Sequence, residues 1–277
     1  MKNDIRYSVL MAVYIKETAE HLELAIKSML NQTVKTNDFV LVKDGPLIPE
    51  LDEVINKYST MYPGLFNIIE LDKNMGLGYA LKVGVEHCKN EWIARMDSDD
   101  FSIPERCEKQ LELIRKKSNL DIVGSSIIEF SGYIGNVQAY NHLPETNEEI
   151  HEYAKRRCPF SHPSLMIRKS KILEVGNYRE YHLCEDYELW TRMLANGAQC
   201  YNINEYLVYI RVDENFYKRR GGIKYLKSIL SLKTELYKRG FYSFKDYCIS
   251  SSAHIVMCLL PNRIRTFLYK KFLRKKI

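Results

Sequence analysis

Long apolar runs are missing from this sequence of 277 residues. The longest, from about Ile255 to Leu260, is far shorter than the roughly 20 residues that a membrane-spanning helix needs. The apolar stretch Val9 to Val13 is too brief for the core of a signal peptide and lacks a small-residue cleavage site. We therefore expect a cytoplasmic protein without a span across the bilayer.

Paired cysteines are also missing. The seven cysteines are an odd number and include no CxxC pair, which predicts reduced, mostly packed thiols rather than disulfides or a zinc site. With 45% hydrophobic and 27% charged residues, the chain has the composition of a protein that buries a core and does not stay disordered. Its length allows one large domain, or a main domain with an appendage.

Acidic residues are absent after Asp246, whereas seven basic residues follow it. Ile264, Phe267, Leu268 and Phe272 follow helical spacing among these cations, a pattern typical of a helix that lies on an anionic membrane. A solvated basic terminus is the alternative. A nucleic-acid surface is less favoured, because no recognition motif accompanies the basic residues.

Short apolar strands alternate with amphipathic helices over the first hundred residues. Such repeats predict a mostly parallel sheet flanked by helices, with ligands bound beyond the carboxyl ends of the strands. The expected strands are residues 7–14, 39–42, 66–71 and 92–96. One helix is expected to begin after Thr18, and three more are expected over residues 50–62, 77–88 and 105–117.

Acidic side chains follow several of these strands. In the segment Met96 to Asp100, the two-residue period of extended chain would point Asp97 and Asp99 the same way, toward a divalent cation or the ligand that it carries. Ser102 and Glu105 have the spacing of a capping box for the next helix, which would leave Asp97 and Asp99 free for binding.

Other motifs allow two interpretations each. Gly76 and Gly78 open a predicted helix but match no dinucleotide- or phosphate-binding fingerprint, so a tight turn is equally plausible. Glu185 and Asp186 begin another predicted helix. There the helix dipole stabilises acidic side chains, or one of these carboxylates acts as a general base. His162 precedes an apolar strand and is either structural or a ligand.

Taken together, the motifs resemble the family-2 glycosyltransferases, which are inverting enzymes of the GT-A fold. The similarity runs in order over roughly residues 5 to 215. It rests on SVLMAVY with Glu17, KDGP, DKNMGLGYALKVG, IARMDSDD, SHPSLMIRK, CEDYELWTRM and YIRV. The resemblance implies a GT-A domain over residues 1–215, with a nucleotide-sugar half (1–105) and an acceptor half (106–215). A helical region over 216–277 would carry the basic, membrane-associating tail.

The resemblance also implies roles for individual residues. Asp186 would be the general base, Asp99 and His162 would bind Mn²⁺ or Mg²⁺, and Glu185 and Trp190 would contact the acceptor. A core position for Trp190 is about as plausible. The residues implied for the nucleotide-sugar donor are Glu17, Asp44, Lys73, Gly76, Arg95, Asp97 and Arg211.

The expected reaction moves a sugar, from a donor such as a UDP-hexose, to a lipid-linked or oligosaccharide acceptor in O-antigen, capsule or exopolysaccharide synthesis. The basic tail would hold the enzyme at the inner face of the cell membrane. Lys43 departs from the family pattern, which usually has an acid there. Two alternatives are a sugar-phosphate nucleotidyltransferase, disfavoured because no glycine-rich loop follows the first strand, and a noncatalytic membrane-surface module.

Overall fold

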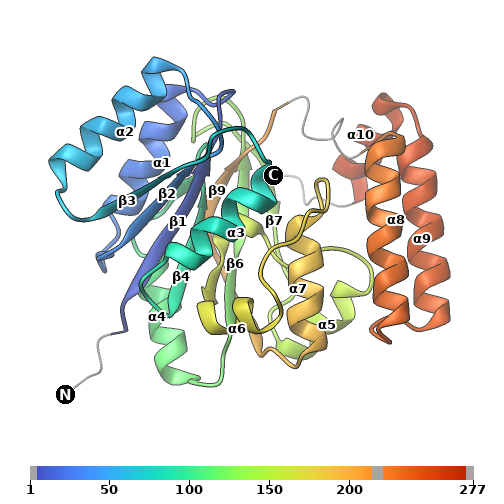
Figure 1. The fold of residues 1–277 in the computed structure, drawn as a ribbon. Helices are drawn as coiled ribbons and strands as arrows, with labels where there is room; N and C mark the ends of the chain where they lie inside the picture. The colour runs from blue at the N-terminus through green and yellow to red at the C-terminus, as the bar shows by residue number, and fades with distance from the viewer. Residues whose placement is uncertain (1–4, 214–220, 273–277) are drawn as a thin grey trace.

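The computed structural model describes residues 5–213 and 221–272, and Figure 1 shows how its helices surround a central sheet. The strands are β1 (Tyr7–Val13), β2 (Phe39–Lys43), β3 (Phe66–Glu70), β4 (Trp92–Asp97), β5 (Phe101–Ser102), β6 (Ile122–Phe130), β7 (Val137–Asn141), β8 (Met166–Arg168) and β9 (Cys200–Arg211). The helices are α1 (Ala19–Leu30), α2 (Pro49–Met61), α3 (Leu77–His87), α4 (Arg106–Lys116), α5 (Asn147–Ala154), the 3-10 turn η1 (His162–Ser164), α6 (Lys169–Glu174), α7 (Glu185–Ala195), α8 (Ile223–Lys238), α9 (Phe244–Leu259) and α10 (Asn262–Phe272).

The sheet has nine strands in the order β3-β2-β1-β4-β8-β6-β9-β5, with β7 paired to β6. The first four strands are parallel neighbours, whereas β8 runs antiparallel to both β4 and β6. Pairing of Val13 with Lys43, and of Ala12 with Asp97, brings the carboxyl ends of three strands to the same edge. The predicted α/β fold class, a mostly parallel sheet flanked by helices, is confirmed.

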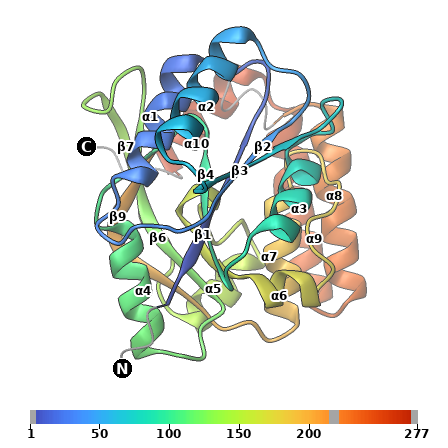
Figure 2. The same ribbon diagram turned by 60° about the vertical axis from the view of Figure 1, so that its left-hand side comes forward.

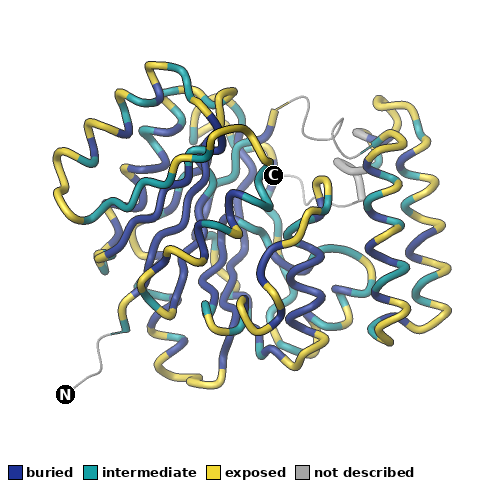
Figure 3. The backbone as a smooth tube through the Cα atoms, viewed as in Figure 1, coloured by how far each residue is buried: buried dark blue, intermediate teal, exposed yellow. Residues whose placement is uncertain are grey.

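Alternating side chains of β1 build two hydrophobic cores, one on each face of the sheet. Val9 and Met11 pack with residues of α1, α2 and α4, whereas Leu10 and Ala12 pack with residues of α3, α6 and α7. Figure 2 shows α1 and α2 on the opposite side of the sheet from α3 and α6. Figure 3 shows the strands buried between these layers.

Local sequence signals set most helix boundaries. The Thr18 hydroxyl accepts a hydrogen bond from the His21 amide and caps α1 as predicted. Gly197 follows α7 with a φ of 79°, a conformation that favours glycine after a helix end. Added side-chain atoms at Gly84 would lie 2.3 Å from Leu10, so this glycine lets α3 pack closely on the sheet.

The capping box expected at Ser102 and Glu105 is wrong. Ser102 belongs to β5, which pairs with β9, and its hydroxyl accepts a hydrogen bond from Nε2 of Gln32 at 3.1 Å. Helix α4 follows Glu105, which caps it without a side-chain hydrogen bond. Ser102 therefore forms contacts with β9 and Gln32, both distant in the sequence, in place of a cap on α4.

Helices α8 and α9 lie side by side at the edge of the molecule nearest α5 and α7 (Figure 1). Tyr187 of α7 connects them to the rest, because its hydroxyl contacts the Ala154 carbonyl at 2.5 Å and the Tyr242 hydroxyl at 3.0 Å. Ile229 and Cys258 pack in the same buried cluster. In the described ranges, none of the helices has the length and apolarity needed to cross a membrane, and all seven cysteines are free thiols.

Candidate active site

Three acids lie at the edge where β1 and β4 end, and we call them the acidic centre: Glu17, Asp97 and Asp99. Glu17, in the loop after β1, accepts a hydrogen bond from the Ser98 hydroxyl at 2.8 Å, which joins this loop to the acidic segment after β4. Burial and the negative charges of Asp97 and Glu17 raise the pKa of Asp99 to about 7. The structure therefore brings these three acids together, as their positions after parallel strands predict.

Arg95 lies beneath this centre with a side chain that is only 1% exposed. Its Nη1 is 2.5 Å from Oδ1 of Asp97, an ion pair that orients the carboxylate. Within the described part of the chain, Nε and Nη2 have no hydrogen-bond partner. A buried cation with unpartnered N–H groups favours an anionic ligand nearby.

Arg211, at the end of β9, holds the acidic segment in place. Its backbone amide donates to Oδ1 of Asp100 at 2.8 Å, and its Nε donates to the Asp99 carbonyl at 3.0 Å. The guanidinium also contacts the Gly132 carbonyl and lies over the Phe130 ring. The structure thus gives Arg211 a positioning role, and it shows Asp100 as a buried anchor that the motif alone did not assign.

Asp44 holds the turn that precedes α3. Its two carboxylate oxygens accept hydrogen bonds from the backbone amides of Met75 and Gly76, at 2.7 and 3.0 Å. Gly76 caps α3 with a φ of 88°, which other residues rarely adopt. Lys73 lies in the same turn and is exposed at the sheet edge. Lys43, which departs from the family pattern, forms ion pairs with Asp52 and Glu70.

Glu185 and Asp186 begin α7 and line a cavity of about 650 Å³. Asp97 lines the same cavity, so this one acid of the β4 end borders the same space as Asp186. Oδ1 of Asp186 accepts the Tyr187 amide at 2.7 Å. Burial and the charge of Asp186 raise the pKa of Glu185 to about 7. Asp99, expected to point the same way as Asp97, is not among the residues that line this cavity. The charges of Asp97 and Glu17 both act on its carboxylate.

Gly78 explains part of the glycine motif at the start of α3. A side chain there would lie 3.1 Å from the Arg179 carbonyl and 3.2 Å from Cβ of Glu185. The absence of that side chain lets α3 approach the start of α7. Gly78 therefore leaves room for Glu185, a role that the sequence motif did not indicate.

His162 lines the cavity but is tied to an aromatic group. Its Nε2 contacts the Tyr178 hydroxyl at 2.9 Å, and its ring packs edge-on to Trp190. Burial and the charge of Arg95 hold its pKa well below the usual value, so the imidazole is neutral. Among the described residues, no group of three or more histidines, cysteines or acids is arranged to hold a metal ion. The metal-binding roles expected for Asp99 and His162 therefore stay predictions.

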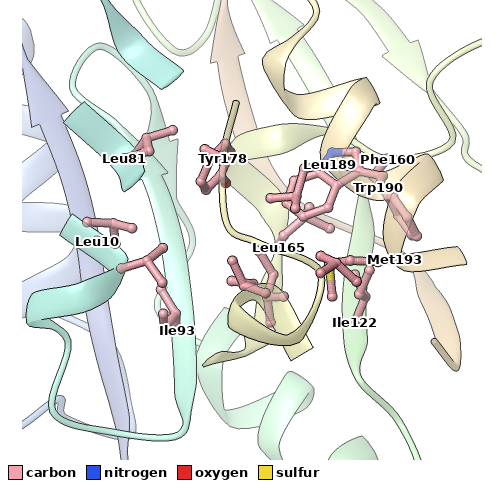
Figure 4. Close-up of a cluster of buried hydrophobic side chains, with 14 of the residues drawn as sticks. Leu10, Leu81, Ile93, Ile122, Phe160, Leu165, Tyr178, Leu189, Trp190 and Met193 are labelled. Atoms are coloured by element: carbon pink, nitrogen blue, oxygen red, sulfur yellow. The ribbon is translucent and has the colours of Figure 1, made fainter. Parts of the chain in front are cut away.

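Trp190 lies in the hydrophobic core and has no exposed surface. Figure 4 shows it packed beside Phe160 and Leu189, within a cluster that extends to Tyr178. A side chain without exposed surface cannot stack on a sugar, so the expected acceptor contact is corrected to a core position. The indole instead supports the wall that carries His162 and Asp186.

Comparison with solved structures places this fold among GT-A-like glycosyltransferases. A mannosyltransferase from Pyrobaculum calidifontis, solved with GDP-Man and Mn²⁺, superposes with a TM-score of 0.66 at 11% identity, covering 95% of this chain and 72% of the other. TarS from S. aureus superposes with a TM-score of 0.61 at 16% identity, covering 96% of this chain and 44% of TarS.

The sequence comparisons identify the family. The model of glycosyl transferase family 2 matches residues 8–176. A UDP-Gal:alpha-D-GlcNAc-diphosphoundecaprenol beta-1,3-galactosyltransferase from Escherichia coli is 36% identical, over 98% of this chain and 97% of its own. The amylovoran biosynthesis glycosyltransferase AmsE from Erwinia amylovora is 34% identical, over 96% and 98%.

The chain therefore belongs to glycosyltransferase family 2, and it is a glycosyltransferase. This result confirms the family suggested by the ordered motifs. It also excludes the nucleotidyltransferase alternative, which the missing glycine-rich loop after β1 disfavoured.

Proposed function

We propose that the protein transfers a hexose from a nucleoside-diphosphate donor, with inversion, to a sugar carried on a lipid diphosphate. The single observation that carries this proposal is the cavity that Asp97 and Asp186 share. The relatives from Escherichia coli and Erwinia amylovora, similar over nearly the whole chain, support a role in surface-polysaccharide synthesis.

Asp186 is the proposed general base. It takes the proton from the acceptor hydroxyl while that oxygen bonds to the anomeric carbon of the donor sugar. The bond from that carbon to the diphosphate breaks, and its electron pair leaves with the diphosphate. Attack from the side of Asp186, opposite the leaving group near Asp97, inverts the anomeric centre.

A divalent cation is proposed to bind at the acidic centre together with the donor diphosphate. Mg²⁺ is commonly held by one or two carboxylates together with substrate phosphates, and the crowding of acids around Asp99 favours an added positive charge. We assign this role to Asp99, with Mn²⁺ or Mg²⁺ as the ion. When bound, the metal offsets the charge that develops on the departing diphosphate.

The donor nucleotide is proposed to lie over the ends of β1 and β2. Glu17 and Asp44 follow these strands and are proposed to line the donor site, with Lys73 and Gly76 in the turn that Asp44 holds. Arg95 neutralises Asp97 beneath the sugar and the diphosphate. Glu185 is proposed to contact the acceptor beside Asp186.

Substitution Asp186→Asn tests the proposed chemistry, because it removes the base while keeping the shape of the side chain. We expect transfer to fall by about a hundredfold or more, while a UDP- or GDP-sugar still raises the melting temperature in the presence of Mn²⁺. The measurements are turnover with a panel of sugar nucleotides and thermal unfolding with the same panel. Full turnover by the variant contradicts the assignment of the base. Loss of donor binding would instead indicate a structural role.

A further inference from the structure

The active-site cavity extends beyond the acids to a wall formed by the C-terminal helices. This wall lies outside residues 8–176, the part matched by the family model. It is largely apolar and is built by Tyr225 and Ile229 of α8, Ala253, His254 and Met257 of α9, and Leu268 of α10. Burial, together with the charges of Lys233 and Arg157, lowers the pKa of His254 to about 4, so this histidine adds no charge to the wall.

Two arginines line the same cavity as this wall and the acids. Arg156 and Arg157 follow α5, and neither forms an ion pair with a carboxylate in the described part of the chain. Arg157 lines the cavity and also lies over the Tyr153 ring, with its guanidinium 5.3 Å from the ring centroid. Two adjacent cations without a carboxylate partner are suited to a group with several negative oxygens.

The apolar wall continues onto an exposed surface of α9. At 100° per residue, Ala253 and Met257 lie next to the helix face that carries Ile249 and Val256. These two side chains are 60% and 58% exposed. A chain that leaves the cavity along α9 would therefore stay on an apolar path to the outside of the molecule.

We propose that Arg156 and Arg157 bind the diphosphate of the acceptor, and that the first part of its lipid chain lies on the wall of α8, α9 and α10. This inference rests on the proposed function and adds the acceptor site to it. The acceptor sugar would then extend from the arginines toward Glu185 and Asp186. Charge complementarity selects the diphosphate, and the apolar wall selects a lipid rather than a free oligosaccharide.

Two synthetic acceptors with the same sugar test the proposal. One carries a diphosphate and a long alkyl chain, and the other carries the same chain without phosphate. For the double variant Arg156→Gln/Arg157→Gln we expect KM for the first acceptor to rise about tenfold or more, because charge-assisted hydrogen bonds are lost. KM for the second acceptor and for the donor should stay unchanged. Replacement of both arginines by lysine should restore part of the affinity.

Lys116→Gln provides a matched control, because Lys116 is an exposed cation at the end of α4, outside the cavity. Met257→Ala and Leu268→Ala should reduce the preference for long chains without changing KM for a short-chain diphosphate acceptor. Equal effects of the arginine variant on both acceptors would overturn the inference. Failure of the unsubstituted enzyme to use either acceptor, with donor binding intact, would instead overturn the proposed function.

Discussion

Gly78 shows how one missing side chain shapes the active site. The approach of α3 to Cβ of Glu185 leaves no room for a methyl group without a shift of a few tenths of an ångström. Asp186 follows Glu185 directly, so such a shift would move the proposed base as well. Small displacements of catalytic groups reduce rates strongly, because the reacting atoms must be aligned.

Substitution Gly78→Ala should therefore impair turnover more than folding. Crowding costs about 1–3 kcal/mol, while alanine is favoured over glycine in helices by about 1 kcal/mol. We expect kcat to fall about tenfold, with a melting temperature within a few degrees of the original. Lys82→Ala, at an exposed position on the same helix, is the control. An unchanged kcat in the Gly78→Ala enzyme would show that the approach of α3 does not position Glu185.

At the scale of elements, helices α8 and α9 enclose an unusual lysine. Lys233 is fully buried, and its amine donates to the backbone carbonyl and the hydroxyl of Ser250. Burial lowers its pKa from 10.5 to about 7. The unfolded chain therefore binds more protons than the folded chain between pH 7 and 10.5, so this residue makes stability rise with pH across that window.

Lys233→Met should remove this dependence. Each pKa unit corresponds to about 1.4 kcal/mol, so the buried amine costs several kcal/mol near pH 7, of which part is offset by its hydrogen bonds to Ser250. We expect the variant to be more stable than the original at pH 7, with the difference shrinking toward pH 10. Urea unfolding at several pH values measures this. A constant difference across the range would contradict the lowered pKa.

The elements also show how far the sequence predicts the structure. Apolar periodicity and the Thr18 cap define β1 to β4 and the helices between them, because those signals are local. The predicted capping box at Ser102 is wrong because the Ser102 hydroxyl accepts a hydrogen bond from Gln32, 70 residues away. The contacts of Arg211 with Asp99 and Asp100 span more than 100 residues, and nothing in the local sequence indicates them.

The same limit applies to the candidate site. Its acids are predictable, since the ends of parallel strands must meet at one edge. The surroundings that decide the role of each residue are not predictable in this way. Phe160, His162 and Tyr178 come from separate segments, and their rings pack around Trp190, which makes it a core residue. The C-terminal wall becomes part of the site through packing of α8 and α9 on α7.

At the scale of the whole molecule, the described side chains of α10 belong to the predicted membrane-binding tail. Ile264 and Phe267 of α10 are 48% and 59% exposed, and Arg263 is exposed beside them. Arg265, expected on a cationic face, is buried and contacts the Cys258 carbonyl instead. Arg274, Lys275 and Lys276 lie outside the described residues, as do the side chains of Lys270, Lys271 and Phe272. Removal of everything from Pro261 would also remove Leu268 from the cavity wall, so point substitutions test membrane binding more cleanly than truncation.

The double substitution Ile264→Glu/Phe267→Glu should weaken attachment to membranes, because it places charge on the apolar residues that would enter the lipid interface. We expect the original protein to sediment with vesicles that contain anionic lipid and to be released by high salt, since each basic residue near such a surface contributes about 1 kcal/mol. The double variant should stay in the supernatant and retain turnover of a water-soluble acceptor. Tyr133→Glu, at a side chain that is 72% exposed on the β6–β7 hairpin, is a matched control and should bind vesicles normally. Equal vesicle binding by all three proteins would place the membrane contact elsewhere on the molecule.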